Sequence, residues 1–182
     1  MSKGHLFHIS GKKGSGKSTL LGWLSDDGYF TTEVRFHLEE ALAAKKIDTR
    51  DIPVPFWWTE PMLQLCYEQL NDHTPVFLTG MYHPNELAFF TKGYEVHNIG
   101  LVADDSVRHT RILDRKRVKE ENLTIEDIRF KDQKRDGSVG HKADINALIR
   151  LAEFTFVNNT TLEDFRQEYD EFKRYLNKRY SL

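Results

Sequence analysis

Several features that would assign the chain to a specialised class are scarce or missing. Among 182 residues there is one cysteine, Cys66, so an internal disulfide is excluded and a cysteine-built metal site is disfavoured. No run of about 18 apolar residues occurs, and a glycine-rich loop lies near the N-terminus, where a signal peptide would need an apolar stretch. A net charge of −2 gives no sign of a globally basic nucleic-acid binder. We expect one soluble, cytoplasmic domain spanning residues 1–182, with Cys66 as a buried apolar residue.

Short apolar runs alternate along the chain with longer amphipathic stretches. This alternation predicts an α/β fold with a largely parallel sheet. Strands are expected at residues 5–10, 29–34, 75–80, 96–103 and 154–158.

Helical periodicity predicts the segments between these strands. Helices are expected at 17–26, 36–46 and 61–71. Thr124 with Asp127, and Thr161 with Asp164, have the spacing of capping boxes that open two further helices. In the last of these, apolar residues recur at spacings of three and four, which predicts core packing. They are Phe165, Tyr169, Phe172 and Leu176.

The stretch "GKKGSGKST", residues 11–19, has the pattern G-x-x-x-x-G-K-[ST] between a predicted strand and a predicted helix. Its glycines let the backbone turn tightly and direct N–H groups at a phosphate, at the positive end of a helix. Lys17 would bridge the β- and γ-phosphates of a nucleotide, and the Ser18 hydroxyl would be a ligand of Mg²⁺. ATP and Mg²⁺ are therefore the expected cofactors. The nucleotide-binding residues expected are Gly11, Lys13, Gly14, Ser15, Gly16, Lys17, Ser18 and Thr19.

A second cluster of cations lies in the segment from about 106 to 140. Arg108, Arg111 and Arg115 recur at helical spacing, and Arg117 follows. Guanidinium groups neutralise the charge that spreads over a transferring phosphoryl group, so Arg111, Arg115 and Arg117 join Lys17 as candidate catalytic residues. Interleaved acidic residues leave a second interpretation open, a solvated helix with internal ion pairs.

Taken together, these motifs resemble the P-loop small-molecule kinases, in particular the adenylate-kinase-like and dephospho-coenzyme A kinase-like branch. The resemblance implies a three-layer P-loop NTPase fold: a five-stranded, mostly parallel sheet, helices on both faces and an arginine-rich helical lid. It also implies that Asn158 contacts the adenine and that Glu33 and Arg35 receive the acceptor. The lid sequence matches only in part, because Lys131 and Asp132 stand where Arg-Asp is usual.

The chain departs from that family at the end of the predicted third strand. Such kinases commonly have an aspartate there, to hold Mg²⁺ through water or to activate the acceptor, whereas this chain has Thr79. Three explanations are open. Another carboxylate, such as Glu33, Asp104 or Asp105, takes part; or Ser18 and waters suffice; or catalysis has been lost.

The stretch "DIPVPFWWTEP" contains three adjacent large aromatic residues, which cannot all face one core. Trp57 and Trp58 are candidates for the wall of an acceptor pocket, where they could stack on a base. The alternative is a loop that its aromatic side chains pin to the body of the protein.

The leading functional hypothesis is an ATP-dependent phosphotransferase acting on a nucleotide-like acceptor, either a nucleoside monophosphate or a related hydroxyl or phosphate. One alternative keeps the chemistry and makes a hydroxyl of DNA or RNA, such as one on a modified base, the acceptor. Another is a nucleotide-sensing module without transferase activity. The sequence leaves open the acceptor, the choice of ATP or GTP, and the oligomeric state.

Overall fold

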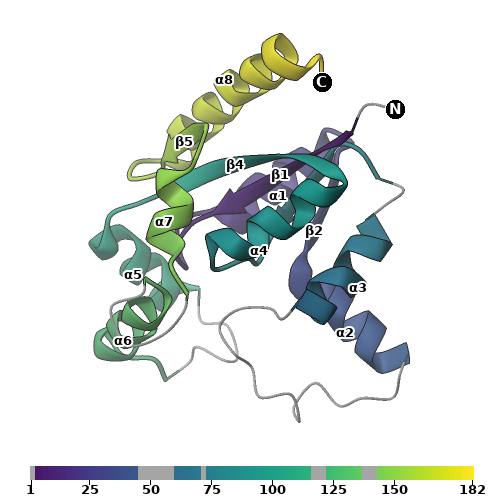
Figure 1. Cartoon of the computed structure of the whole chain (residues 1–182). Coiled ribbons are helices and arrows are strands. Elements are labelled where there is room, and N and C mark those ends of the chain that lie inside the picture. The colour runs from purple at the N-terminus through teal and green to yellow at the C-terminus, as the bar shows by residue number, and fades with distance from the viewer. Residues whose placement is uncertain (1–2, 45–59, 71–72, 116–121, 137–142) are drawn as a thin grey trace.

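The computed structural model describes residues 3–44, 60–70, 73–115, 122–136 and 143–182. In these ranges five strands form one sheet in the order β2-β3-β1-β4-β5, and all of its neighbouring strands pair in parallel (Figure 1). The strands are β1 (Gly4–Ser10), β2 (Phe30–Glu33), β3 (Val76–Thr79), β4 (Tyr94–Val102) and β5 (Phe154–Val157). All five expected strands are therefore confirmed, as is the α/β fold with helices around a parallel sheet.

Helices connect these strands, as parallel pairing requires. Those in the first half are α1 (Lys17–Asp26), α2 (Val34–Ala44), α3 (Glu60–Leu70), α4 (Pro84–Phe89) and the short η1 (Phe90–Lys92). Those in the second half are α5 (Asp105–Asp114), α6 (Ile125–Arg135), α7 (Ile145–Arg150) and α8 (Leu162–Tyr180). None of the helices in the described ranges has both the length and the apolar composition needed to cross a membrane.

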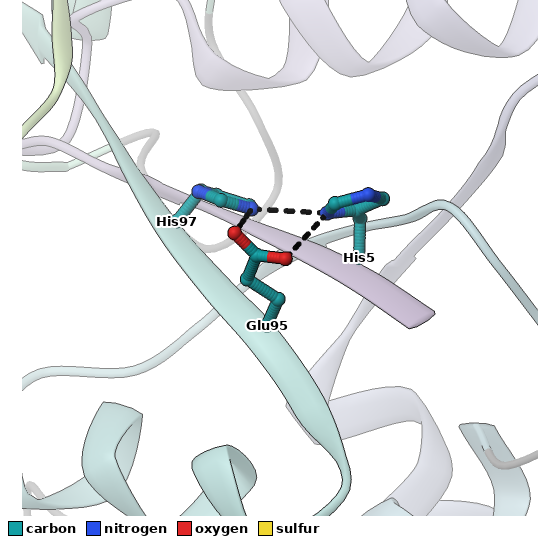
Figure 2. Close-up of side chains that lie close together, drawn as sticks. All are labelled: His5, Glu95 and His97. Carbon is teal, nitrogen blue, oxygen red and sulfur yellow. Dashed lines mark hydrogen bonds and ion pairs between the residues drawn. The ribbon is translucent and has the colours of Figure 1, made fainter. Parts of the chain in front are cut away.

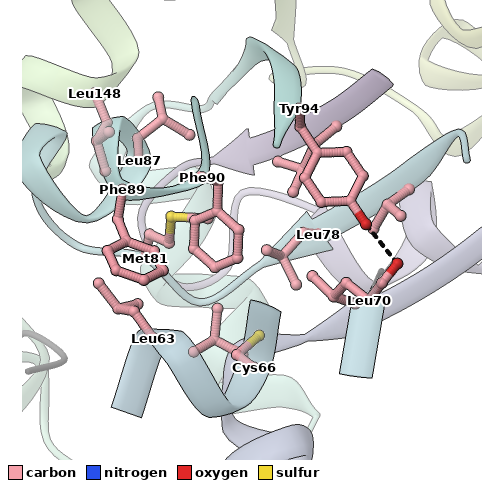
Figure 3. Packing of buried hydrophobic residues seen from close by; sticks show 13 residues of the cluster. Leu63, Cys66, Leu70, Leu78, Met81, Leu87, Phe89, Phe90, Tyr94 and Leu148 are labelled. Atoms are coloured by element: carbon pink, nitrogen blue, oxygen red, sulfur yellow. Dashed lines mark hydrogen bonds between the residues drawn. The ribbon is translucent and has the colours of Figure 1, made fainter. Parts of the chain in front are cut away.

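Each face of the sheet carries its own buried core. Phe7 and Phe77 contribute to the core under α1 and α8, and the predicted stripe of α8 is buried there. Leu6 and Leu78 point to the opposite face, where residues of α3, α4 and η1 complete the second core (Figure 3). Cys66 lies in this second core, as expected, and burial raises the pKa of its thiol to about 12. Because the central strands are covered on both sides, their ends are what remains for a binding site.

Helix ends agree with the capping signals read from the sequence. Thr124 and Thr161 each accept a hydrogen bond from the backbone N–H three residues on, and each box is closed by the expected aspartate. The helix expected at 36–46 begins two residues earlier, because β2 passes directly into α2 at Val34. Helix α4 was not predicted, although Glu86 closes a capping box with His83 at its start.

Candidate functional site

The glycine-rich loop joins the carboxyl end of β1 to α1 and has the backbone that its sequence predicts. Gly14 and Gly16 have φ values of 83° and 112°, a region that favours glycine. A Cβ atom on Gly16 would lie 2.5 Å from the Asn158 Nδ2 atom, and one on Gly11 would lie 2.4 Å from the Leu101 carbonyl oxygen. These contacts show that a side chain at either glycine would force the loop or its neighbours to move.

Lys17 begins α1 and its side chain folds back over the loop. Its Nζ atom donates hydrogen bonds to the carbonyl oxygens of Gly11, at 2.7 Å, and Lys12, at 3.0 Å. Burial, together with the positive charges of Arg135, Arg108 and Arg115, lowers the pKa of Lys17 to about 7, although Glu33 acts in the opposite direction. The surroundings therefore disfavour the charged form of Lys17, and an incoming anion would raise its pKa again.

A cleft of about 390 Å³ opens over the loop at the carboxyl edge of the sheet. Its size suits a small molecule or part of a nucleotide. Six segments line it: the end of β1 with the loop and the start of α1, the end of β2, the end of β3 with the stretch after it, the C-terminal part of α5, the end of α6, and the start of α7. Of the predicted site residues, it brings together Gly11, Lys13, Gly14, Gly16, Lys17, Ser18, Thr19, Glu33, Arg111 and Arg115.

Arg111 and Asn158 connect this cleft to the loop after β5. The Arg111 guanidinium donates hydrogen bonds to the backbone carbonyl of Asn158 at 2.8 Å and to its side-chain oxygen at 3.1 Å. The Asn158 amide nitrogen donates in turn to the carbonyl oxygen of Ser15, at 2.9 Å, and the residue is buried. Asn158, for which adenine contact was expected, thus links the glycine-rich loop to α5.

Arg108 has a different environment from its neighbours in the arginine-rich segment. Only 1% of its side chain is exposed, and it donates to Asp105 and Asp132, each at 2.5 Å, and to the Lys13 carbonyl oxygen at 2.6 Å. Because Asp132 belongs to α6, this ion pair joins α5 to α6, which lie side by side (Figure 1). Arg108 therefore holds the arginine-rich segment together and does not line the cleft.

Arg135, at the end of α6, lines the cleft and was not singled out from the sequence. Its guanidinium carbon lies 5.9 Å from the centre of the Tyr82 ring, which also lines the cleft. Its spacing from Asp132 could have predicted this position. Asp132 pairs with Arg108 and so fixes α6 against α5, and Arg135 lies one helical turn further along the same face.

Strand register indicates which carboxylate lies near Thr79, where the resemblance led us to expect an aspartate. Glu33 ends β2 and pairs with Thr79, which ends β3, so the two residues lie side by side at the carboxyl edge. Both line the cleft. Asp105 is bound to Arg108, and the backbone N–H of Asp104 donates to the Asn159 side chain; neither aspartate lines the cleft. Glu33 is the carboxylate that the described residues offer at this edge.

Two further predicted site residues, Ser15 and Arg35, are not among the residues that line the cleft. Ser15 is a fully buried residue of the loop itself, and Arg35 is on the exposed start of α2, paired with Glu39. Trp57, Trp58 and Arg117 lie outside the described residues. The structure therefore gives no test of the proposed aromatic wall.

Comparisons with known proteins concern the fold. No family model matches the sequence, and no curated protein matches it. Among solved structures, the chain is similar to shikimate kinase from Bacteroides thetaiotaomicron, with 12% identity, a TM-score of 0.63, and coverage of 94% of this chain and 98% of that one. Shikimate kinase from Acinetobacter baumannii in complex with shikimate has 13% identity, a TM-score of 0.58, and coverages of 98% and 95%.

A gluconokinase from Sinorhizobium meliloti 1021 is also similar, with 14% identity, a TM-score of 0.52, and coverage of 99% of this chain and 98% of that one. The narrower branch suggested by the sequence, adenylate-kinase-like or dephospho-coenzyme A kinase-like, is not confirmed by these structures. What the geometry and the similarities establish together is the fold: this chain has the fold of the P-loop kinases.

Proposed function

We propose that this protein transfers the γ-phosphoryl group of ATP to a hydroxyl group of a small anionic molecule. The observation that carries the proposal is the convergence of Lys17, Arg111, Arg115 and Arg135 on one cleft above a phosphate-binding loop. Charge develops on the transferring group and its leaving oxygen during phosphoryl transfer, and fixed cations stabilise it. A protein that only senses a nucleotide would not need cations from three separate helices.

The residues of the loop fit a nucleotide polyphosphate. Its glycines at 14 and 16 adopt the positive φ values of a tight turn, and the buried Ser15 Oγ atom has no hydrogen-bond partner among the described residues. Ser18 follows Lys17 at the start of α1 and lines the same cleft, so its hydroxyl is the group that would hold Mg²⁺. When bound, Mg²⁺ would neutralise phosphate charge and orient the polyphosphate.

In the proposed reaction the acceptor oxygen forms a bond to the γ-phosphorus. The bond from that phosphorus to the β–γ bridging oxygen breaks, and ADP leaves with the electron pair. The hydroxyl proton passes to the carboxylate of Glu33, the acidic group that lines the cleft beside Thr79. Lys17 and Arg111 stay in contact with the phosphate oxygens throughout and lower the barrier through positioning and charge.

The charge of the cleft supports an anionic acceptor. Arg115 and Arg135 add to Lys17 and Arg111, whereas Glu33 is the carboxylate among the lining residues. The similar structures described above are named for kinases of shikimate and gluconate, both small carboxylates with hydroxyl groups. A nucleoside monophosphate meets the same charge requirement, so the nucleotide-like acceptor expected from the sequence remains one class within this proposal.

The experiment is ADP release from ATP and Mg²⁺, alone and with a panel of acceptors. The panel contains hydroxylated carboxylates, including shikimate and gluconate, nucleoside monophosphates, dephospho-coenzyme A, and oligonucleotides with hydroxylated bases. The proposal is supported if a small anion stimulates ADP release and if Lys17→Ala abolishes that stimulation. Lys178→Ala, which changes an exposed lysine of α8, should keep it. Stimulation by oligonucleotides alone would overturn the acceptor class. ATP binding without turnover on any acceptor would favour a sensing module.

A further inference from the structure

We propose that the amino edge of the sheet, opposite the cleft, binds a divalent transition-metal ion such as Zn²⁺ through His5, Glu95 and His97. The three side chains come from β1 and β4 and point toward one another (Figure 2). Strand register explains their meeting: His5 pairs with Glu95, and Phe7 with His97, so all of them project from the same face of the sheet. This site is independent of the proposed kinase chemistry.

The donor atoms lie within about 0.1 Å of the spacing of atoms that share one zinc ion. His5 Nδ1 lies 3.1 Å from His97 Nε2, and the Glu95 carboxylate oxygens lie 3.7 Å from the former and 3.9 Å from the latter. Four-coordinate zinc with bonds of about 2.0–2.2 Å separates its ligand atoms by roughly 3.1–3.8 Å. Two imidazoles and one carboxylate form a donor set suited to Zn²⁺, with water available for the remaining position.

A second layer of groups orients His97. Its Nδ1 atom lies 3.0 Å from the Glu153 carboxylate, and the Tyr180 hydroxyl lies 3.0 Å from the same nitrogen and donates to Glu153 at 2.8 Å. A proton on Nδ1, held by Glu153, leaves the lone pair of Nε2 directed at His5 and Glu95. A carboxylate behind a histidine is the arrangement that fixes the tautomer of metal-binding histidines.

Charge also favours a cation at this position. Glu95 and Glu153 both flank His97, and in the described part of the chain their ion pairs involve histidines, with no lysine or arginine among them. The side chain of His97 is 5% exposed while that of Glu95 is 60% exposed, so the site has a fixed inner ligand and an outer ligand that faces solvent. A metal ion could therefore enter without opening the core.

A second group of potential ligands, Asp105, His109 and Asp132, offers a useful contrast. The Arg108 guanidinium already lies between its two carboxylates, at 2.5 Å from each, and supplies the positive charge. A metal ion there would have to displace a buried arginine. The two groups can be told apart by variants, because they share no residue.

The test is zinc binding to the full chain, freed of any affinity tag and of nucleotide, in competition with a chromophoric chelator. We expect one Zn²⁺ per chain with a dissociation constant at or below about 1 µM, weaker than structural sites with four protein ligands. Glu95→Gln should weaken binding at least 10-fold, and Glu153→Gln, which removes the orienting carboxylate, by about 10–100-fold. Zinc should raise the melting temperature of the wild type more than that of Glu95→Gln.

The controls are His73→Gln and Glu163→Gln, which remove one imidazole and one exposed carboxylate outside the cluster and should leave binding unchanged. The Glu95 side chain is largely exposed, so the Glu95→Gln variant should fold. The test therefore does not depend on a variant of the buried His97, which could fail to fold. Binding weaker than about 100 µM, binding that Glu95→Gln leaves intact, or binding that His109→Gln abolishes would each overturn the proposal.

Discussion

The carboxyl and amino ends of the β1–β4 strand pair differ in charge and in how far their residues could be predicted from the sequence. At the carboxyl edge, the strand ends and the helices beyond them gather lysine and arginine around a cleft. At the amino edge, the same two strands bring together histidines and carboxylates with tyrosines of α8. One sheet thus presents a cationic site at one end and an anion-rich site at the other. The difference teaches that the polarity of each end has its own source: loops and helices beyond the strands supply the cations, whereas β1 and β4 themselves supply His5, Glu95 and His97.

The largest expected effect comes from removing the central cation of the carboxyl edge. Lys17→Ala should lower turnover by at least about 10³-fold, because the group that contacts both the loop and the transferring phosphate is lost. Its melting temperature should stay close to that of the wild type. Steady-state ADP release measures the loss, with Lys178→Ala as the control. Full turnover in Lys17→Ala would contradict the phosphate assignment of the loop.

The next prediction separates the structural residues of the carboxyl edge from those that line the cleft. Arg108→Met should destabilise the fold by about 3 kcal/mol, because the buried carboxylate of Asp132 is left without its partner. Denaturant unfolding gives the free energy. Arg174→Met, which removes an exposed pair with Glu171, should change it by less than about 0.5 kcal/mol. Equal effects of the two variants would mean that Arg108 is not a structural centre.

A smaller loss is expected when the carboxylate of the cleft is neutralised. Glu33→Gln should lower kcat by about 10²-fold, because the acceptor hydroxyl loses its proton acceptor. The KM for ATP should change little, since the phosphate contacts are intact. Initial-rate kinetics with the identified acceptor separate the two constants, and Glu163→Gln serves as the exposed control. A raised KM for ATP with an unchanged kcat would assign Glu33 to nucleotide binding instead.

Proton uptake offers a pH-dependent test of the same edge. In the empty protein the pKa of Lys17 is lowered to about 7, so at pH 8 the amine is mostly neutral. Bound phosphates favour the charged form and raise its pKa again, so ATP binding at pH 8 should take up close to one proton. At pH 6 the amine is already charged and uptake should be small. Calorimetry in buffers of different ionisation enthalpy measures this number, and equal uptake at both pH values would contradict it.

The smallest expected effect tests whether the two edges act independently of each other. Glu95→Gln, at the amino edge, should leave turnover within about twofold, because its side chain belongs to the opposite end of the strands. The same variant should alter zinc binding. Both are measured on one preparation. A large loss of turnover would show that the two edges are coupled through the sheet.

How well each part could be predicted follows from how its residues are distributed along the chain. The glycine-rich loop is continuous in the sequence, and its strand and helix follow from local pattern, so its cleft residues from Gly11 to Thr19 could be named in advance. Arg108 and Arg111 have the same local pattern but different partners, and only the position of Asp132 on α6 separates the buried residue from the cleft residue. The amino-edge cluster joins His5 to His97, 92 residues apart, and His97 to Glu153, 56 residues apart, and no local signal connects these segments.

The hydrogen bonds that the Lys17 amine donates to two backbone carbonyl oxygens limit which ligands can bind beside it. An anion entering the cleft meets an amine that already donates hydrogen bonds to the carbonyl oxygens of Gly11 and Lys12, and it has to restore the charge of that amine. A monatomic ion offers a single point of contact and has no further atoms for the loop. A chain of phosphates offers oxygen atoms to the amine and to several backbone N–H groups together. We therefore expect the cleft to select its ligand by the number and spacing of the ligand's oxygen atoms as well as by its charge.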